Sequence, residues 1–209
     1  MTRIFALTAL ISILALFGVT YFLIQGRNTS DLFAQCRATR VAGGSGQIGG
    51  PFTLVNQSGE TVTSANLIDQ PTLIYFGYTF CPDVCPLDSA RNVEAVEILE
   101  SKGMMVKPVF ISIDPERDTP DVMAEFVKYQ HARMVGLTGS PEQVKAASQA
   151  YRTYFKKQEP EAGEEDYYLV DHSTFTYLTF PGHGFAEFFR RDLTAQQLAD
   201  RVACFVDAT

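Results

Sequence analysis

The sequence predicts an α/β fold, because short apolar runs alternate along the chain with segments of helical spacing. The runs are rich in β-branched and aromatic residues and are bounded by glycine or proline, as buried strands are. Two of the helical segments begin at a serine or threonine followed by proline, which is typical of a helix start. A closing hairpin and a last helix complete a sheet that is predicted to carry helices on both faces.

The predicted elements follow one another in a regular order from about residue 52. They are a hairpin (52–55 and 61–63), a strand (72–76), a helix (86–102), a strand (109–113), a helix from 120, a short strand (135–138), a helix from 141 to about 157, a hairpin (175–180 and 185–189) and a helix (194–202). Gly103 ends the first long helix, and Ser140 with Gln143 gives a capping-box pattern for the third. This order is that of a thioredoxin-like fold with an N-terminal hairpin extension.

A single transmembrane helix is predicted ahead of that fold. Residues 4–24 carry no charge and, at about 1.5 Å per residue, form roughly 30 Å of helix, which matches the hydrocarbon core of a bilayer. A cleaved signal peptide is the alternative, but no A-x-A-like cleavage site follows the stretch. Arginines flank it on both sides, so loop charge alone does not settle its orientation.

The amino-acid composition excludes one class of function and helps to divide the chain into regions. The chain has 209 residues, with 17 Lys and Arg against 24 Asp and Glu, and a net charge of −7. This acidic balance argues against a nucleic-acid-binding protein, which needs clustered basic residues. We divide the chain into a membrane anchor (1–27), a tether (28–48) that contains glycine and serine, and one globular domain (49–209).

Cys81 and Cys85 are the most informative pair of residues. They lie between the central strand and the first long helix, at the sheet edge where open α/β folds place their sites. If the helix begins near Asp83, the spacing puts both sulfurs on one side of its first turn. The N-terminal end of a helix favours thiolate over thiol, and thiolates are both soft metal ligands and redox nucleophiles. The pair alone therefore fits either copper binding or dithiol chemistry.

His172 is the candidate third member of the site. It comes just before the strand predicted from residue 175, and one imidazole with two thiolates suits three-coordinate copper. A lone histidine is more often solvated or hydrogen-bonded, so its position alone does not make it a ligand. His131 falls near a predicted helix end and His183 in a glycine-flanked turn, and neither is assigned to the site.

Four separated segments, with the predicted fold, lead to a known family. They are residues 75–86, 113–120, 136–139 and 171–173. In this order they resemble the Sco/SenC family of membrane-anchored, thioredoxin-like copper proteins, over about residues 49–207. The resemblance implies that one copper ion, monovalent or divalent, is bound by Cys81, Cys85 and His172.

The resemblance also implies a function and a location. It implies a copper-binding assembly factor, mainly a carrier, that helps build the dinuclear copper centre of cytochrome c oxidase subunit two. Another copper chaperone and a thiol reductant are possible further partners. The implied location is the inner membrane, with the domain in the periplasm or, in mitochondria, in the intermembrane space, which gives the anchor its orientation.

Two other activities compete with copper carriage. A thiol:disulfide oxidoreductase would use Cys81 and Cys85 as a redox-active pair to reduce that subunit or another extracytoplasmic protein, and His172 would be incidental. Peroxidase activity has the least support, since no dedicated peroxide pocket is identified in the sequence. In an oxidising compartment the remaining cysteines, Cys36 and Cys204, can pair as a structural disulfide, with two free thiols as the alternative.

Overall fold

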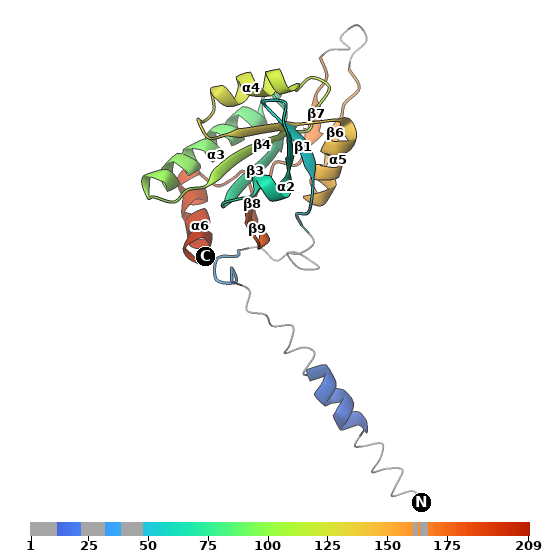
Figure 1. Cartoon of the computed structure of the whole chain (residues 1–209), viewed down its shortest axis with the longest axis vertical. Coiled ribbons are helices and arrows are strands. Elements are labelled where there is room, and N and C mark those ends of the chain that lie inside the picture. The colour runs from blue at the N-terminus through green and yellow to red at the C-terminus, as the bar shows by residue number, and fades with distance from the viewer. Residues whose placement is uncertain (1–11, 22–31, 39–47, 161–162, 164–166) are drawn as a thin grey trace, which may run out of the picture. The chain divides into compact units, whose positions relative to one another are not determined.

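The computed structural model describes most of the chain (Figure 1). The described residues are 12–21, 32–38, 48–160, 163 and 167–209. The chain divides into a first unit over Met1–Gln35 and a second over Cys36–Thr209. All the strands described below belong to the second unit, which also contains the candidate site.

The predicted transmembrane helix is not shown by the structure. Within the first unit, residues 12–21 are helical. The rest of the predicted span, residues 4–11 and 22–24, lies outside the described residues. Among the described residues, no helix combines the length and the apolar character that a membrane crossing requires.

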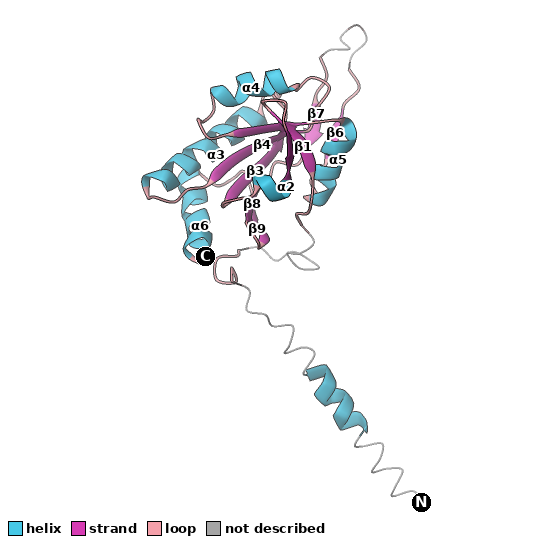
Figure 2. Ribbon diagram, viewed as in Figure 1, coloured by secondary structure: helices cyan, strands magenta, loops and turns pink. Residues whose placement is uncertain are grey.

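Nine strands and five helices form the described part of the second unit (Figure 2). In order they are β1 (Thr53–Asn56), β2 (Thr61–Thr63), α2 (Ser64–Leu67), β3 (Thr72–Gly77), α3 (Val84–Ser101), β4 (Lys107–Ser112), α4 (Pro120–Lys128), β5 (Val135–Thr138), α5 (Pro141–Ala150), β6 (Phe155–Lys157), β7 (Val170–His172), β8 (Thr176–Phe180), β9 (Gly184–Phe189) and α6 (Ala195–Asp207). The predicted α/β class and the N-terminal hairpin, β1 with β2, are confirmed.

Seven of the strands form one mixed sheet, in the order β2-β1-β5-β4-β3-β8-β9. Strands β3, β4 and β5 are parallel, whereas β8 pairs antiparallel with β3 on its other side. Every residue of β3 is buried, as the apolar run predicts for a central strand. The parallel strands end at one edge of the sheet, and the loops that follow β3 and β4 meet there.

Aromatic side chains fill the core on both faces of the sheet, because successive residues of a strand point to opposite faces. On one face Tyr75 packs on Phe110 with ring centroids 5.9 Å apart, and Phe110 packs on Phe126 of α4 at 4.6 Å. On the other face Phe76 contacts Tyr151, which follows α5, at 5.5 Å. Helices therefore cover both faces, as predicted.

The third predicted long helix ends earlier than expected, at Ala150 rather than near residue 157. Arg152 adopts a left-handed conformation with φ 51°, which stops the helix. The N–H of Thr153 then donates to the carbonyl of Ser148 at 3.0 Å, and the Ser148 hydroxyl donates to the carbonyl of Thr153 at 2.8 Å. The chain that follows forms β6, which pairs antiparallel with β7 in a separate two-stranded sheet.

A disulfide joins Cys36 to Cys204 of α6, with Cα atoms 5.7 Å apart. The predicted pairing is confirmed, and the alternative of two free thiols is wrong. The same segment is held by a second contact, since the N–H of Ala38 donates to the buried Glu187 carboxylate at 3.1 Å. Residues 36–38, within the predicted tether, are thus fixed to β9 and α6.

Candidate metal centre

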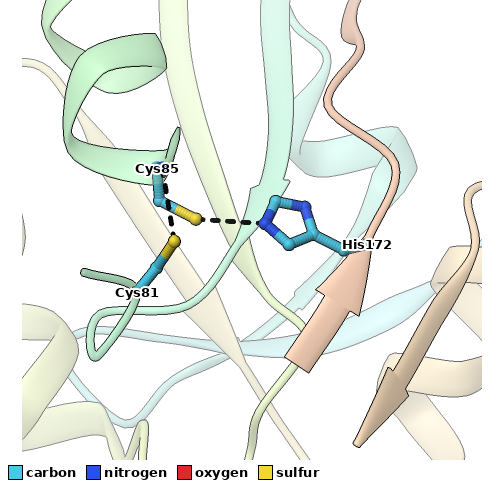
Figure 3. Close-up of side chains that lie close together, drawn as sticks. All are labelled: Cys81, Cys85 and His172. Atoms are coloured by element: carbon cyan, nitrogen blue, oxygen red, sulfur yellow. Dashed lines mark hydrogen bonds between the residues drawn. The ribbon is translucent and has the colours of Figure 1, made fainter. Parts of the chain in front are cut away.

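Cys81, Cys85 and His172 lie together at the end of β3 (Figure 3). The two sulfurs and one imidazole nitrogen lie within 4.8 Å of one another. The Cys85 Sγ and His172 Nε2 atoms are 3.3 Å apart, although the residues are separated by 87 positions in the chain. The structure therefore brings together all three residues that the sequence singled out.

The first turn of α3 orients the two cysteines. Asp83 is the N-cap residue, but its side chain makes no capping hydrogen bond. The backbone N–H of Cys85, one of the unpaired donors at the helix start, instead donates to Cys81 Sγ at 3.4 Å. The N–H of Cys81 donates to the Tyr78 carbonyl at 3.3 Å. Backbone groups thus hold the Cys81 sulfur beside Cys85.

Gly77, the last residue of β3, leaves the space that the Cys85 side chain occupies. A Cβ atom at this position would lie 3.0 Å from Cys85 Sγ and 2.9 Å from Cε1 of Tyr75. Both distances are shorter than ordinary van der Waals contacts. The strand can therefore end this close to the sulfur only with glycine at position 77.

The imidazole of His172 presents one particular nitrogen to the sulfurs. Its Nδ1 lies 2.9 Å from the Ser173 carbonyl oxygen, which can only accept a hydrogen bond, so we assign the proton to Nδ1. Nε2 then carries the free lone pair and faces Cys85. Tyr75 and Tyr78 pack edge-on against the ring, with centroids 6.3 and 5.9 Å away. This orientation is the one that a metal ligand requires.

Burial dominates the electrostatics of the site. Cys85 is 1% exposed, and this burial raises the pKa of its thiol well above the ordinary value, helped by a hydrogen bond with Cys81. Burial also lowers the pKa of His172, so the imidazole is neutral near pH 7. For Cys85, desolvation of the buried charge favours the thiol, whereas the position at a helix N-terminus predicts a thiolate.

The comparisons with known proteins identify the family. The model of the SCO1/SenC family matches residues 41–207. The chain belongs to the SCO1/SenC family. Protein SenC of Rhodobacter capsulatus is 47% identical over 203 residues, which cover 97% of this chain and 90% of that protein.

Solved structures extend this relationship to the fold and to copper. The structure of Arabidopsis thaliana ScoI with copper bound is 43% identical in sequence and has a TM-score of 0.69. The match covers 77% of this chain and 97% of the ScoI chain. The structure of yeast Sco1 with copper bound is 36% identical in sequence and has a TM-score of 0.73. The match covers 78% of this chain and 90% of the Sco1 chain. The thioredoxin-like fold is therefore confirmed, and relatives hold copper.

The donor set of this SCO1/SenC chain fits the same metal. Two sulfurs and one imidazole suit monovalent copper, which prefers soft ligands. A structural zinc site would have four ligands. Among the described residues, no other group of at least three histidine, cysteine or acidic side chains is close enough to hold a metal ion.

The other two histidines lie outside the centre. His131 Nε2 is 3.2 Å from a carboxylate oxygen of Glu100, and its Nδ1 accepts the N–H of Arg133 at 3.1 Å. His183 is exposed in the turn between β8 and β9. The sequence reasoning missed Tyr75 and Tyr78, which enclose His172. The period-two pattern could have indicated Tyr75, because it shares a strand face with Gly77.

Proposed function

We propose that this protein carries one copper ion on Cys81, Cys85 and His172 and delivers it to the dinuclear copper centre of cytochrome c oxidase subunit two. The convergence of the three donor atoms within 4.8 Å is the observation that carries the proposal. The copper bound in ScoI and Sco1, and the match of this chain to their family, support it.

Copper loading exchanges a proton for the metal. The raised pKa of Cys85 keeps its thiol protonated near pH 7, so this residue releases a proton when its sulfur binds copper. His172 needs no deprotonation, because its Nε2 lone pair already faces the sulfurs. Delivery then proceeds by ligand exchange, in which cysteines and histidines of the apo-subunit replace these three ligands one after another.

Exposed apolar side chains beside the site support a direct transfer to a protein. Phe80, Leu87 and Leu169 are 56, 62 and 47% exposed, and each lies within three residues of a proposed ligand. Cys81 and Cys85 are themselves buried. Because both cysteines are buried, the ligands of the partner would have to approach closely, and the partner would then cover these three side chains, which we call the apolar rim.

The disulfide and the sequence support a proposed location. The Cys36–Cys204 bond supports an oxidising compartment, since such bonds are rare in the cytosol. Residues 1–27 would anchor the chain in the inner membrane, with residues 28–48 as the tether and residues 49–209 in the periplasm. In a mitochondrial setting the same arrangement faces the intermembrane space.

A thiol:disulfide oxidoreductase is the second candidate, favoured by one observation. Cys81 is the more exposed of the two residues, at 7% against 1% for Cys85, and the Cys85 N–H donates to the Cys81 sulfur at 3.4 Å. Cys81 would attack a disulfide of the partner and form a mixed disulfide, and Cys85 would then displace the partner. The products are a Cys81–Cys85 disulfide and a reduced partner dithiol, so two electrons and two protons pass to the partner.

A copper titration separates these two functions. The full chain in detergent, with Cys81 and Cys85 reduced, is titrated with monovalent copper against a competing chelator. We expect His172→Ala to weaken copper binding by at least about 10–100-fold. Replacement of a group that only orients a metal ligand has an effect of this size, and loss of the ligand itself should have at least the same effect. His183→Ala is the matched control and should bind as the wild type does.

The opposite result would favour the oxidoreductase. Equal copper affinity in wild type and His172→Ala, with disulfide reduction unchanged, would make His172 incidental and overturn the carrier proposal. Cys81→Ser removes a group that both functions need, so it does not discriminate between them.

A further inference from the structure

Arg117 occupies a position between three aromatic rings beside the metal centre. Its guanidinium carbon lies 3.6 Å from the centroid of Tyr168, 5.0 Å from that of Phe80 and 5.7 Å from that of Tyr78. Cations at these distances from an aromatic face are attracted to it, more strongly where water is excluded. The side chain of Arg117 is only 15% exposed, so these contacts are largely shielded from water.

The three rings come from the two segments that carry the proposed ligands. Tyr78 and Phe80 precede Cys81 in the loop after β3. Tyr168 lies two residues before β7, which ends at His172. One guanidinium group therefore lies between the segment that positions the sulfurs and the segment that positions the imidazole.

Arg117 is itself held in place from the loop after β4. Its Nε donates to Asp114 at 2.5 Å, and the Tyr168 hydroxyl donates to the other oxygen of the same carboxylate at 2.7 Å. The adjacent Asp118 accepts the Thr79 N–H at 3.0 Å, which ties this loop to the cysteine loop. A planar group fixed by an ion pair and stacked on a ring is far less mobile than a lysine would be.

We propose that Arg117 is a positioning residue that sets the spacing between the His172 imidazole and the two sulfurs. The inference rests on the proposed copper function, because the spacing matters only if all three side chains bind one ion. A second link, from the Val170 N–H to the Tyr78 hydroxyl at 3.2 Å, remains when Arg117 is changed. Loss of Arg117 should therefore loosen the site without separating the two segments.

The first test needs no metal. In the reduced metal-free chain, NMR cross-relaxation between the rings of His172 and Tyr78, whose centroids are 5.9 Å apart, reports how close the imidazole lies to the loop that carries the cysteines. We expect Arg117→Gln to weaken these signals and Arg117→Lys to restore them only in part. Arg190→Gln is the matched control, since it removes one positive charge from a side chain that is 74% exposed. Unchanged signals in folded Arg117→Gln protein would overturn the proposal.

The second test asks whether Arg117 acts through His172. We expect Arg117→Gln to weaken copper binding by about 10–100-fold, the usual effect of groups that orient a ligand. In divalent-copper protein the nitrogen coupling in the electron paramagnetic resonance spectrum should fall toward that of His172→Ala. In a His172→Ala background the same change should have no further effect on affinity.

The outcomes separate the two proposals. Additive losses in the double variant would show that Arg117 acts independently of His172 and would overturn the positioning role. Equal copper binding by wild type and His172→Ala would instead refute the carrier function, and the metal-free measurement would still decide whether Arg117 sets the spacing.

Discussion

Gly77 has no side chain and so leaves room for the Cys85 sulfur at the candidate metal centre. Substitution by alanine would place a Cβ 3.0 Å from Cys85 Sγ and 3.0 Å from Cζ of Phe110. We expect Gly77→Ala to lower the free energy of unfolding by about 1–3 kcal/mol, as overpacking does, and to weaken copper binding because the sulfur must shift. Urea denaturation of the metal-free chain and copper titration measure the two effects.

Gly50→Ala is the matched control for this prediction. Its Cβ would lie 3.6 Å from Cβ of Ala150, an ordinary van der Waals contact. We expect almost no change in stability or copper affinity for this variant. If Gly77→Ala behaved in the same way, the space beside Cys85 would not be limiting.

The burial of His172 predicts an unusual pKa for its imidazole. Burial lowers this pKa in the metal-free protein, so NMR titration of the ring should give a midpoint below the ordinary value of about 6.5. Between about pH 6.5 and the lower midpoint of the folded protein, the unfolded chain binds a proton at His172 more readily than the folded chain does. The free energy of unfolding therefore falls as the pH is lowered through this window. His172→Gln should make the fall less steep, and a wild-type midpoint at or above 6.5 would contradict the prediction.

Elements with strong local signals could be predicted from the sequence. The buried strand β3 and the capped starts of α4 and α5 were recognised because apolar runs and capping residues act over a few positions. Strands β6 and β7 have three residues each, which is too short for a periodic pattern, so no local signal indicated them. The burial of Cys85 could not be predicted either, because it depends on residues such as His172 that are distant in the sequence.

The apolar rim beside the cysteines is expected to affect the transfer of copper to a partner. Leu87 lies in the first turn of α3, beside the cysteines, whereas exposed Met105 lies beyond the other end of the helix. We expect Leu87→Glu to slow copper transfer to the apo-subunit severalfold while leaving copper affinity unchanged, because a charge must then be desolvated at the interface. Met105→Glu should leave the transfer rate unchanged. Equal slowing by both variants would exclude a specific role for the rim.

At the scale of the whole molecule, the four cysteines divide into two pairs with different tasks. Cys81 and Cys85 are free thiols at the end of β3, and Cys36 and Cys204 form the disulfide that closes the second unit. The first pair must be reduced to bind copper, whereas the second pair is oxidised in the same structure. Sequence position distinguished these pairs, because only the first lies between a central strand and a helix.

Removal of the disulfide should therefore affect stability and not copper binding. The bond joins residues 168 positions apart, so it greatly restricts the unfolded chain. We expect the double variant Cys36→Ser, Cys204→Ser to lose about 2–5 kcal/mol of unfolding free energy in urea, with the copper affinity of the folded protein unchanged. A loss of copper affinity in folded protein would mean that the disulfide also shapes the metal centre, and the two cysteine pairs would then not be independent.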